Sequence, residues 1–299
     1  SGRPKNIGGI NVNVLVMDPS DNKTIYWGSE DNGLFYTYDG ARSWQLASSL
    51  GKKTINAVAV DPNSKCIIYA AANNEVYKST DCSRSWSAVY FDNSEKTQIK
   101  AIAIDHYDSA NVYIGTSRGE IIKSQDRGGT WRVIKRFKNE IMSIIISPSD
   151  SRNIFVATKS KGIFRSFDNG DTWESLKEEL KEFKSSTSFR DLVVLGGTPG
   201  YIFLATDYGL LKSSDNGDSW SKIELITPPK KAKVNAIAVN HKNIKEIYYV
   251  TNTTFYRSLD GGENWTTKQL PTAGKGWKLI IDPEDSSVIY MGVKKVGKR

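Results

Sequence analysis

The dominant feature of the sequence is an eight-residue phrase that occurs six times along 299 residues. Each copy begins with Ser or Thr, has Asp at its third position and ends with Trp. The aspartates are Asp39, Asp81, Asp126, Asp168, Asp215 and Asp260, and the tryptophans are Trp44, Trp86, Trp131, Trp173, Trp220 and Trp265. Successive aspartates are 42, 45, 42, 47 and 45 residues apart. Repeats of this period are typical of β-propellers and other repeat arrays.

Each repeat contains four runs of strand-forming residues. In the second repeat these runs are residues 55–60, 66–71, 75–79 and 86–90, and turn-forming residues separate them. β-branched and aromatic residues dominate the runs, which predicts strands. About seven such units fit in the chain, and propellers have about four to eight four-stranded blades. We therefore predict one all-β domain over residues 1–299, a seven-bladed β-propeller of four-stranded antiparallel blades.

The last repeat is incomplete, because residues 276–299 supply only two of the four expected strands. We predict that the N-terminal segment completes this seventh blade. That arrangement would join the two ends of the chain and leave no open sheet edge. The alternative is a chain that continues beyond Arg299.

The repeated phrase has a structural explanation. An Asp at this position accepts backbone hydrogen bonds across its own turn, and the Trp buries a large ring between neighbouring sheets. We therefore predict structural rather than catalytic roles for all six copies. Cys66 and Cys82 fall in one repeat, at the start of its second strand and in its Asp turn. We predict a disulfide between them, which indicates an extracytoplasmic or secreted protein.

The phrase S-x-D-x-G-x-T-W resembles the Asp-box repeat of bacterial neuraminidases, and the resemblance covers essentially the whole chain. It implies a β-propeller. It does not imply one function, because the Asp-box propellers include sialidases, xyloglucanase-like glycosidases, sortilin-type receptors and Ycf48/HCF136-like photosystem II assembly factors. A glycoside hydrolase and a photosystem II assembly chaperone are therefore alternatives to a simple binding role.

Charge is divided unequally between the two ends of the predicted propeller. In antiparallel blades, the turns after the first and third strands share one face, here called the bottom, and the other connections share the top. The top links between blades contain 13 basic and six acidic residues, including Lys230, Lys231 and Lys233, whereas the turns after the first strands contain ten acidic and five basic residues. The positive electrostatic field of a basic surface attracts acidic partners, so we expect them to approach the top face. The alternative is that these lysines only solvate the links.

The second residue of each predicted inner strand breaks the apolar pattern where the strand enters the channel. These residues are Asn13, Asn56, Lys100, Met142, Arg190, Asn235 and Trp277. In two repeats the next residue is also exceptional, because Asp191 and Lys278 replace small side chains. Departures from a regular core pattern are candidates for function. We predict a binding site formed by Lys100, Arg118, Arg190, Asp191, Tyr208 and Trp277, and the alternative is that they only cap the channel.

One link between blades has a helical pattern. Leu176, Leu180 and Phe183 fall at the spacing of a single helical stripe. This spacing predicts a short helix over residues 174–183 at the top rim.

The sequence offers few residues for catalysis. Asp191, Tyr208, Arg118 and Arg190 are the residue types that a glycoside hydrolase of sialidase or xyloglucanase type would use. No cluster has the spacing of a zinc site, so we predict no metal and no cofactor. The links lack an aromatic platform for nucleic acid, and no apolar run is long enough to span a membrane.

Our preferred prediction is a monomeric, non-catalytic binding scaffold. Its basic top face would recognise an acidic protein surface or an anionic glycan, because both carry the charge that the links attract.

Overall fold

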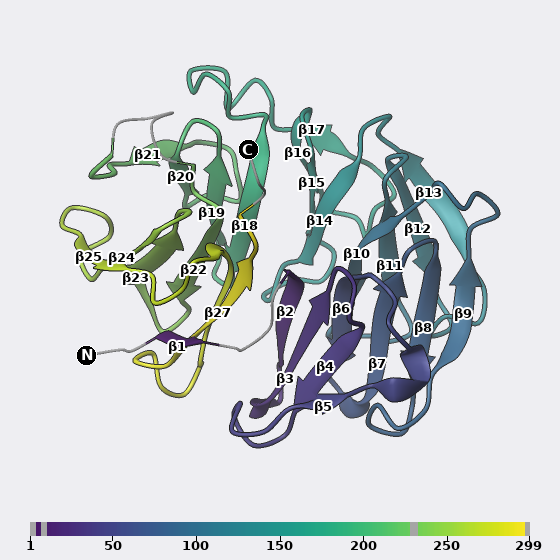
Figure 1. Cartoon of the computed structure of the whole chain (residues 1–299). Coiled ribbons are helices and arrows are strands. Elements are labelled where there is room, and N and C mark those ends of the chain that lie inside the picture. Colours follow the sequence, from purple (N-terminus) through teal and green to yellow (C-terminus); the bar gives the residue numbers. More distant parts are fainter. Residues whose placement is uncertain (1–3, 7–10, 228–232, 297–299) are drawn as a thin grey trace.

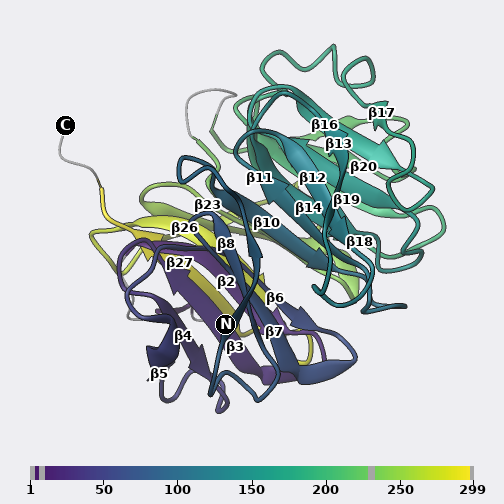
Figure 2. The same cartoon turned by 90° about the vertical axis from the view of Figure 1, so that its right-hand side faces the viewer.

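The computed structural model describes residues 4–6, 11–227 and 233–296. Among these residues, six sheets each contain four antiparallel strands in chain order. The inner strands β2, β6, β10, β14, β18, β22 and β26 each contact the next one, and β26 contacts β2. The inner strands therefore form a closed ring around a central channel, with the sheets radiating from it as separate blades (Figure 1 and Figure 2).

The six four-stranded blades are numbered in chain order. Blade one comprises β2 (Val12–Asp18), β3 (Asp21–Ser29), β4 (Leu34–Thr37) and β5 (Gln45–Leu46), and a short 3-10 helix, Ser48–Leu50, follows it. Blade two comprises β6 (Ile55–Asp61), β7 (Ser64–Ala72), β8 (Glu75–Ser79) and β9 (Ser87–Phe91). Blade three comprises β10 (Ile99–Ile104), β11 (Val112–Thr116), β12 (Glu120–Ser124) and β13 (Arg132–Arg136).

The second half of the chain repeats this plan. Blade four comprises β14 (Ile141–Ile146), β15 (Ile154–Thr158), β16 (Gly162–Ser166) and β17 (Glu174–Ser175). Blade five comprises β18 (Phe189–Leu195), β19 (Tyr201–Thr206), β20 (Leu210–Ser213) and β21 (Ser221–Ile223). Blade six comprises β22 (Ala236–Asn240), β23 (Asn243–Val250), β24 (Thr254–Ser258) and β25 (Thr266–Gln269).

The prediction of seven four-stranded blades is wrong. The structure has six such blades, and the remaining sheet, here called the closing sheet, has three strands in the described residues, in the order β1–β27–β26. β26 (Lys275–Ile281) and β27 (Ile289–Lys294) are antiparallel, whereas β1 (Pro4–Asn6) runs parallel to β27 (Figure 1). A hairpin forces antiparallel pairing, but β1 reaches this edge from the other end of the chain, so it is free to pair in parallel.

The predicted helix over residues 174–183 is also absent. The segment forms β17 and then turns, with i→i+3 hydrogen bonds from Lys181 to Glu178 and from Phe183 to Leu180. The tighter i→i+3 pattern gives short turns rather than an α-helix. The apolar stripe still anchors the link, since Leu176 and Leu180 are fully buried and Phe183 packs edge-on against Tyr208 at a ring-centroid distance of 5.3 Å.

The Asp boxes close their own turns and fasten neighbouring blades together. In blade three, Asp126 accepts a hydrogen bond from the backbone N–H of Thr130 at 2.7 Å and another from its hydroxyl at 2.8 Å. These bonds favour the carboxylate and lower the pKa of Asp126 to about 2. The Trp131 indole N–H donates to the Val89 carbonyl of blade two at 2.9 Å. The box of blade three thereby joins a local turn to the packing between blades.

The fifth position of each box has a left-handed backbone. Glycine occupies it in four boxes, with φ between 89° and 101°, as at Gly128 and Gly262. Ala41 and Ser83 occupy it in the first two boxes with φ values of 67° and 69°. A side chain is disfavoured in this region, so these two turns carry backbone strain.

Blade two contains a disulfide between Cys66 on β7 and Cys82 in the Asp-box turn, and their Cα atoms are 3.9 Å apart. Within the described residues there is no free cysteine. The bond ties the second strand of the blade to the turn between its third and fourth strands.

Candidate binding site at the top of the channel

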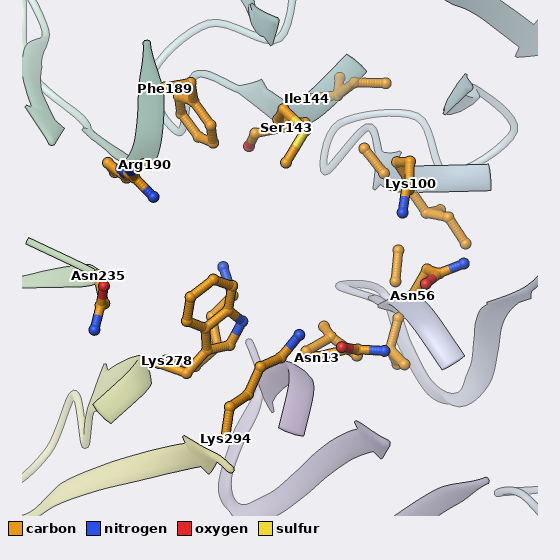
Figure 3. A pocket seen from close by; sticks show the side chains of 17 residues that line it. Asn13, Asn56, Lys100, Ser143, Ile144, Phe189, Arg190, Asn235, Lys278 and Lys294 are labelled. Carbon is orange, nitrogen blue, oxygen red and sulfur yellow. The ribbon is translucent and has the colours of Figure 1, made fainter. Parts of the chain in front are cut away.

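β-bulges direct into the channel the residues that were predicted to lie at its entrance, here called the mouth residues. In six inner strands the ladder to the second strand skips one residue, and the skipped residues are Asn13, Asn56, Lys100, Met142, Arg190 and Trp277. A bulge leaves one residue unpaired and re-aims its side chain. All six, together with Asn235 just before β22, line one cavity of about 340 Å³ (Figure 3). The sequence pattern thus identified a ring of side chains that the structure brings together.

The charge of this cavity is uniformly positive. Its charged lining residues are Lys100, Arg190, Lys278 and Lys294, and no Asp or Glu of the described chain is among the residues that line it. Figure 3 shows the nitrogen ends of Arg190 and Lys294 directed toward the open centre. The remaining walls are amide, apolar and aromatic, which suits a ligand that combines negative charge with some apolar surface.

Three of the four cations are paired with a carboxylate that does not itself line the cavity. Lys100 lies 3.6 Å from Glu140, and Lys278 lies 3.7 Å from Asp191. Arg190 donates to Asp207 through Nε at 2.7 Å and through Nη2 at 2.5 Å. These carboxylates hold the cations in place and offset part of their charge.

Lys294 differs from the other three cations. In the described residues it has no carboxylate within ion-pair distance, and its Nζ lies 4.6 Å from the ring centroid of Trp277. Lys275 approaches the same ring at 4.8 Å. Burial of the ammonium lowers the pKa of Lys294; the charge of Glu30 raises it, and the charges of Lys275, Lys278 and Lys100 lower it further. An anion bound here would provide the missing counter-charge.

Arg118 and Tyr208 lie outside the cavity, and Asp191 is not among its lining residues either. Arg118 is on the outer rim, where it is ion-paired with Asp92 at 2.6 Å and Glu120 at 2.8 Å. Tyr208 packs on Phe183 and lines a separate small cavity with Lys222 and Glu224. The structure therefore does not gather the four residues considered for glycoside hydrolysis.

The other predicted binding residues are more dispersed. Asp191 is directed at its neighbours in the ring, since its carboxylate accepts the backbone N–H of Ile237 at 3.1 Å and faces Lys278. Lys233 is exposed before β22. Lys230 and Lys231 lie outside the described residues.

Sequence reasoning did not select Lys278 and Lys294 as binding residues, although both contribute to the cavity. The sequence did contain a signal for Lys278, because this lysine replaces the small residue that follows the mouth residue in most repeats. Lys294 ends β27 and belongs to a second strand, so the inner-strand pattern did not include it.

Other site types find little support in the described residues. No group of three or more His, Cys, Asp or Glu side chains lies close enough there to hold a metal ion. Nor does that part of the chain contain a helix with the length and apolarity of a membrane span.

Comparison with known proteins agrees with this architecture. The Sortilin-Vps10 family model (sortilin, neurotensin receptor 3) matches residues 119–194. The GH74 xyloglucanase from Xanthomonas campestris has a similar fold, with a TM-score of 0.70 and 19% identity, over 93% of this chain and 50% of that chain. A Ycf48 structure with a bound D1 peptide has a TM-score of 0.67 and 18% identity, over 91% of this chain and 87% of that chain. The resemblance to the Asp-box propellers is confirmed.

The likeness extends to part of a putative two component system. The extracellular domain of a putative hybrid two component system from B. thetaiotaomicron has a TM-score of 0.70 and 14% identity, over 98% of this chain and 38% of that chain. No curated protein matches the sequence. At these identities the similarity shows the fold alone, and the chain spans about half the length of the GH74 enzymes that it matches.

Proposed function

We propose that this protein is a non-catalytic binding scaffold, and that the cavity at the top of its channel holds an acidic segment of a partner protein. The observation that carries the proposal is the charge of the cavity, because the four charged side chains that line it in the described residues are all cationic. Lys294 lacks a carboxylate partner in the described structure, so a carboxylate of the ligand would complete its surroundings.

The links around the cavity support this proposal. The connections between blades on the top face contain exposed lysines, namely Lys52, Lys96, Lys138, Lys177, Lys184 and Lys233. Their field would raise the association rate of an acidic partner and would be screened by salt. The cavity would then fix the position of the segment that reaches it.

Peptide binding agrees with one structural neighbour, since the Ycf48 structure was determined with a D1 peptide bound. An assembly-chaperone role would be one form of such binding. An extracytoplasmic or secreted location also suits the proposal, because disulfides such as Cys66–Cys82 persist in oxidising compartments.

An anionic glycan is the second candidate ligand. Trp277 lies in the cavity wall, and Asn13, Asn56 and Asn235 contribute amide groups to it. Binding pockets commonly combine aromatic walls with a few amides of this kind. The same four cations would then hold carboxylate or sulfate groups on the sugar.

Glycoside hydrolysis has less support from the geometry. Most glycosidases use two carboxyl groups, about 5–5.5 Å or about 6.5–9.5 Å apart, on either side of the scissile bond. The residues that line the cavity in the described chain include no Asp or Glu. Asp191, the one carboxylate among the four residues considered for hydrolysis, already bonds to Ile237 and Lys278.

Fluorescence anisotropy with a fluorescein-labelled oligoglutamate tests the proposal, with oligolysine as the negative control. We expect oligoglutamate to bind, and Lys294→Met to weaken its binding about tenfold, because a charge-assisted contact is lost. Lys245→Met removes an exposed lysine from the bottom face and should leave affinity near that of the wild type. Equal weakening by both variants would show that only net charge matters. Stronger competition by an oligouronate than by unlabelled oligoglutamate would favour the glycan instead.

A further inference from the structure

Lysine and arginine side chains line only the upper of two cavities in the channel, within the described residues. The lower cavity has a volume of about 460 Å³ and mostly apolar walls, which include Met17, Val193 and Ile280. No Lys or Arg of the described chain lines it, in contrast to the four cations of the upper cavity. The arrangement of charge at the upper cavity therefore bears on the kind of ligand that this one site selects.

Two lysines of the closing sheet lie directly opposite each other. Lys275 on β26 is the register partner of Lys294 on β27. Their ammonium nitrogens lie 4.8 Å and 4.6 Å from the ring centroid of the same residue, Trp277. Like charges directly opposite each other in a sheet are destabilising. The pair therefore has a cost in the unliganded protein, and a bound anion would offset it.

The lysine pair has little counter-charge. A third lysine of the closing sheet, Lys278, lies 3.7 Å from Asp191, whereas no carboxylate of the described residues is within ion-pair distance of Lys275 or Lys294. Glu30 attracts Lys294 from beyond that distance and is exposed, so solvent and salt screen its charge. Three ammonium groups therefore share one close carboxylate, which leaves two positive charges without a close partner.

We infer that the closing-sheet side of the upper cavity binds a phosphomonoester dianion, so that the acidic segment of the partner is a phosphorylated one. Lys294 and Lys278 line the cavity, and the nitrogen end of Lys294 is directed toward its open centre (Figure 3). These two lysines would contact the phosphoryl oxygens, while Lys275 adds its charge from the opposite strand.

Charge selects this group over a carboxylate. A phosphomonoester has a charge of about −1.5 to −2 at about pH 7 and three strong acceptor oxygens, whereas a carboxylate has a single charge. Lysine binds phosphate as a point charge, so a cluster of ammonium groups suits it. That the group belongs to a protein segment rests on the proposed function.

A matched pair of small probes tests the charge that the cavity selects. Phenyl phosphate and phenyl sulfate share one ring and a tetrahedral group with three terminal oxygens, but the sulfate has a single charge. The second pKa of a phosphomonoester is about 6, so the phosphate is mainly dianionic near about pH 7.5 and mainly monoanionic near about pH 5. We expect phenyl phosphate to bind about tenfold more tightly than phenyl sulfate at the higher pH, and equally at the lower pH.

Methyl NMR of the methionines locates the bound probe. Of the three methionines in the chain, Met142 lines the upper cavity, Met17 lines the lower cavity and Met291 is fully buried in the core. We expect phenyl phosphate to shift the Met142 signal saturably and to leave Met17 and Met291 in place. A saturable shift of Met17 without Met142 would contradict the site.

Two variants of Lys275 and a matched control test the lysine pair. Lys275→Glu supplies the missing counter-charge within the protein, so the preference for phenyl phosphate near about pH 7.5 should disappear. Lys275→Met removes the like-charge pair, so it should reduce the preference about threefold and raise the thermal midpoint of the unliganded protein. Lys245→Met removes an exposed lysine from the bottom face and should retain both the preference and the midpoint.

The same comparison is made on a labelled peptide. Oligoglutamate with one central phosphoserine should bind about tenfold more tightly near about pH 7.5 than the same peptide with glutamate at that place. A preference for phenyl phosphate without one for the phosphopeptide would overturn the phosphorylated segment. Equal or tighter binding of phenyl sulfate at this pH, or a preference that persists near about pH 5 or in Lys275→Glu, would overturn the dianion site.

The unmodified peptide separates these outcomes from failure of the proposed function. If the probes show no preference but oligoglutamate still binds, and Lys294→Met weakens it, the acidic segment stands and only the phosphoryl group is wrong. If neither oligoglutamate nor phenyl phosphate binds, both proposals fail.

Discussion

The carboxylate of Asp191 lies 3.7 Å from the ammonium of Lys278, although blade six separates the strands that carry them. Asp191 is on β18 and also accepts the backbone N–H of Ile237, on the intervening strand β22, at 3.1 Å. One side chain therefore links three consecutive inner strands. The two residues that depart from the small-residue pattern one step below the mouth are each other's partners.

Replacing Asp191 should affect stability and binding in opposite directions. Asp191→Asn keeps an acceptor for Ile237 but leaves Lys278 without its counter-charge, so we expect the free energy of unfolding to fall by about 1 kcal/mol. The same change makes the cavity more positive, so affinity for oligoglutamate should rise. Urea denaturation and fluorescence anisotropy measure the two effects. The double variant Asp191→Asn/Lys278→Met should recover part of the lost stability, and strictly additive losses would contradict the pairing.

Binding at the top cavity should weaken at high pH. The pKa of Lys294 is lowered by burial and by its lysine neighbours, so its ammonium loses its proton at a lower pH than an ordinary lysine, whose pKa is about 10.4. Loss of this charge removes an attraction for the anion. Affinity for oligoglutamate should therefore fall as pH rises through the lowered pKa, while the unfolding transition remains cooperative.

The conservative variant Lys294→Arg provides the control for this pH dependence. Arginine stays protonated over the whole range, so its affinity should persist to higher pH than that of the wild type. Identical pH profiles for the two proteins would show that another group controls binding.

The glycine position of the Asp box should respond to substitution according to its backbone. Gly170 has a φ of 90°, and a Cβ there would meet the Ile134 Cδ1 atom at 3.0 Å. Gly170→Ala should therefore lower the free energy of unfolding by about 1–2 kcal/mol. Ala41→Gly relieves the same strain in blade one, so it should be neutral or stabilising despite the greater freedom of glycine in the unfolded chain. Thermal denaturation of both variants checks these signs, and a destabilising Ala41→Gly would contradict the strain.

Reduction of the disulfide should destabilise the protein. The bond closes a loop with a sequence separation of 16, and cross-links of this length stabilise by about 3 kcal/mol. We expect the urea midpoint of the wild type to fall when dithiothreitol is added. The variant Cys66→Ser/Cys82→Ser should unfold near the reduced midpoint and should not respond to dithiothreitol. An unchanged wild-type midpoint would show that the bond contributes little.

The sequence was most informative where the pattern is local and repeated. Each Asp box closes a turn within one blade, so its role can be inferred from residue spacing alone. The mouth residues were also found from the pattern, because this step of the inner strands is polar or charged in five repeats and holds Met142 and Trp277 in the other two, which is exceptional in a core. The bulges that aim these side chains, such as the one at Lys100, were not visible in the sequence.

The sequence was less informative about residues in the turns. Arg118 and Tyr208 were assigned to the channel because their turns lie on the top face. In the structure their own neighbours hold them elsewhere, Asp92 and Glu120 for Arg118 and Phe183 for Tyr208. A turn at the outer part of a blade shares a face with the channel without reaching it.

The repeat, the four-stranded plan of a single blade and the ring of unusual residues at the mouth could be inferred from the sequence, since each depends on contacts within one repeat. The folded ring was needed to establish the six complete blades with a three-stranded closing sheet, the pairing of Asp191 with Lys278 and the opposite character of the two cavities. These features depend on which blades become neighbours when the ring closes. That closure brings together residues far apart in the chain, and no periodic pattern specifies which of them will meet.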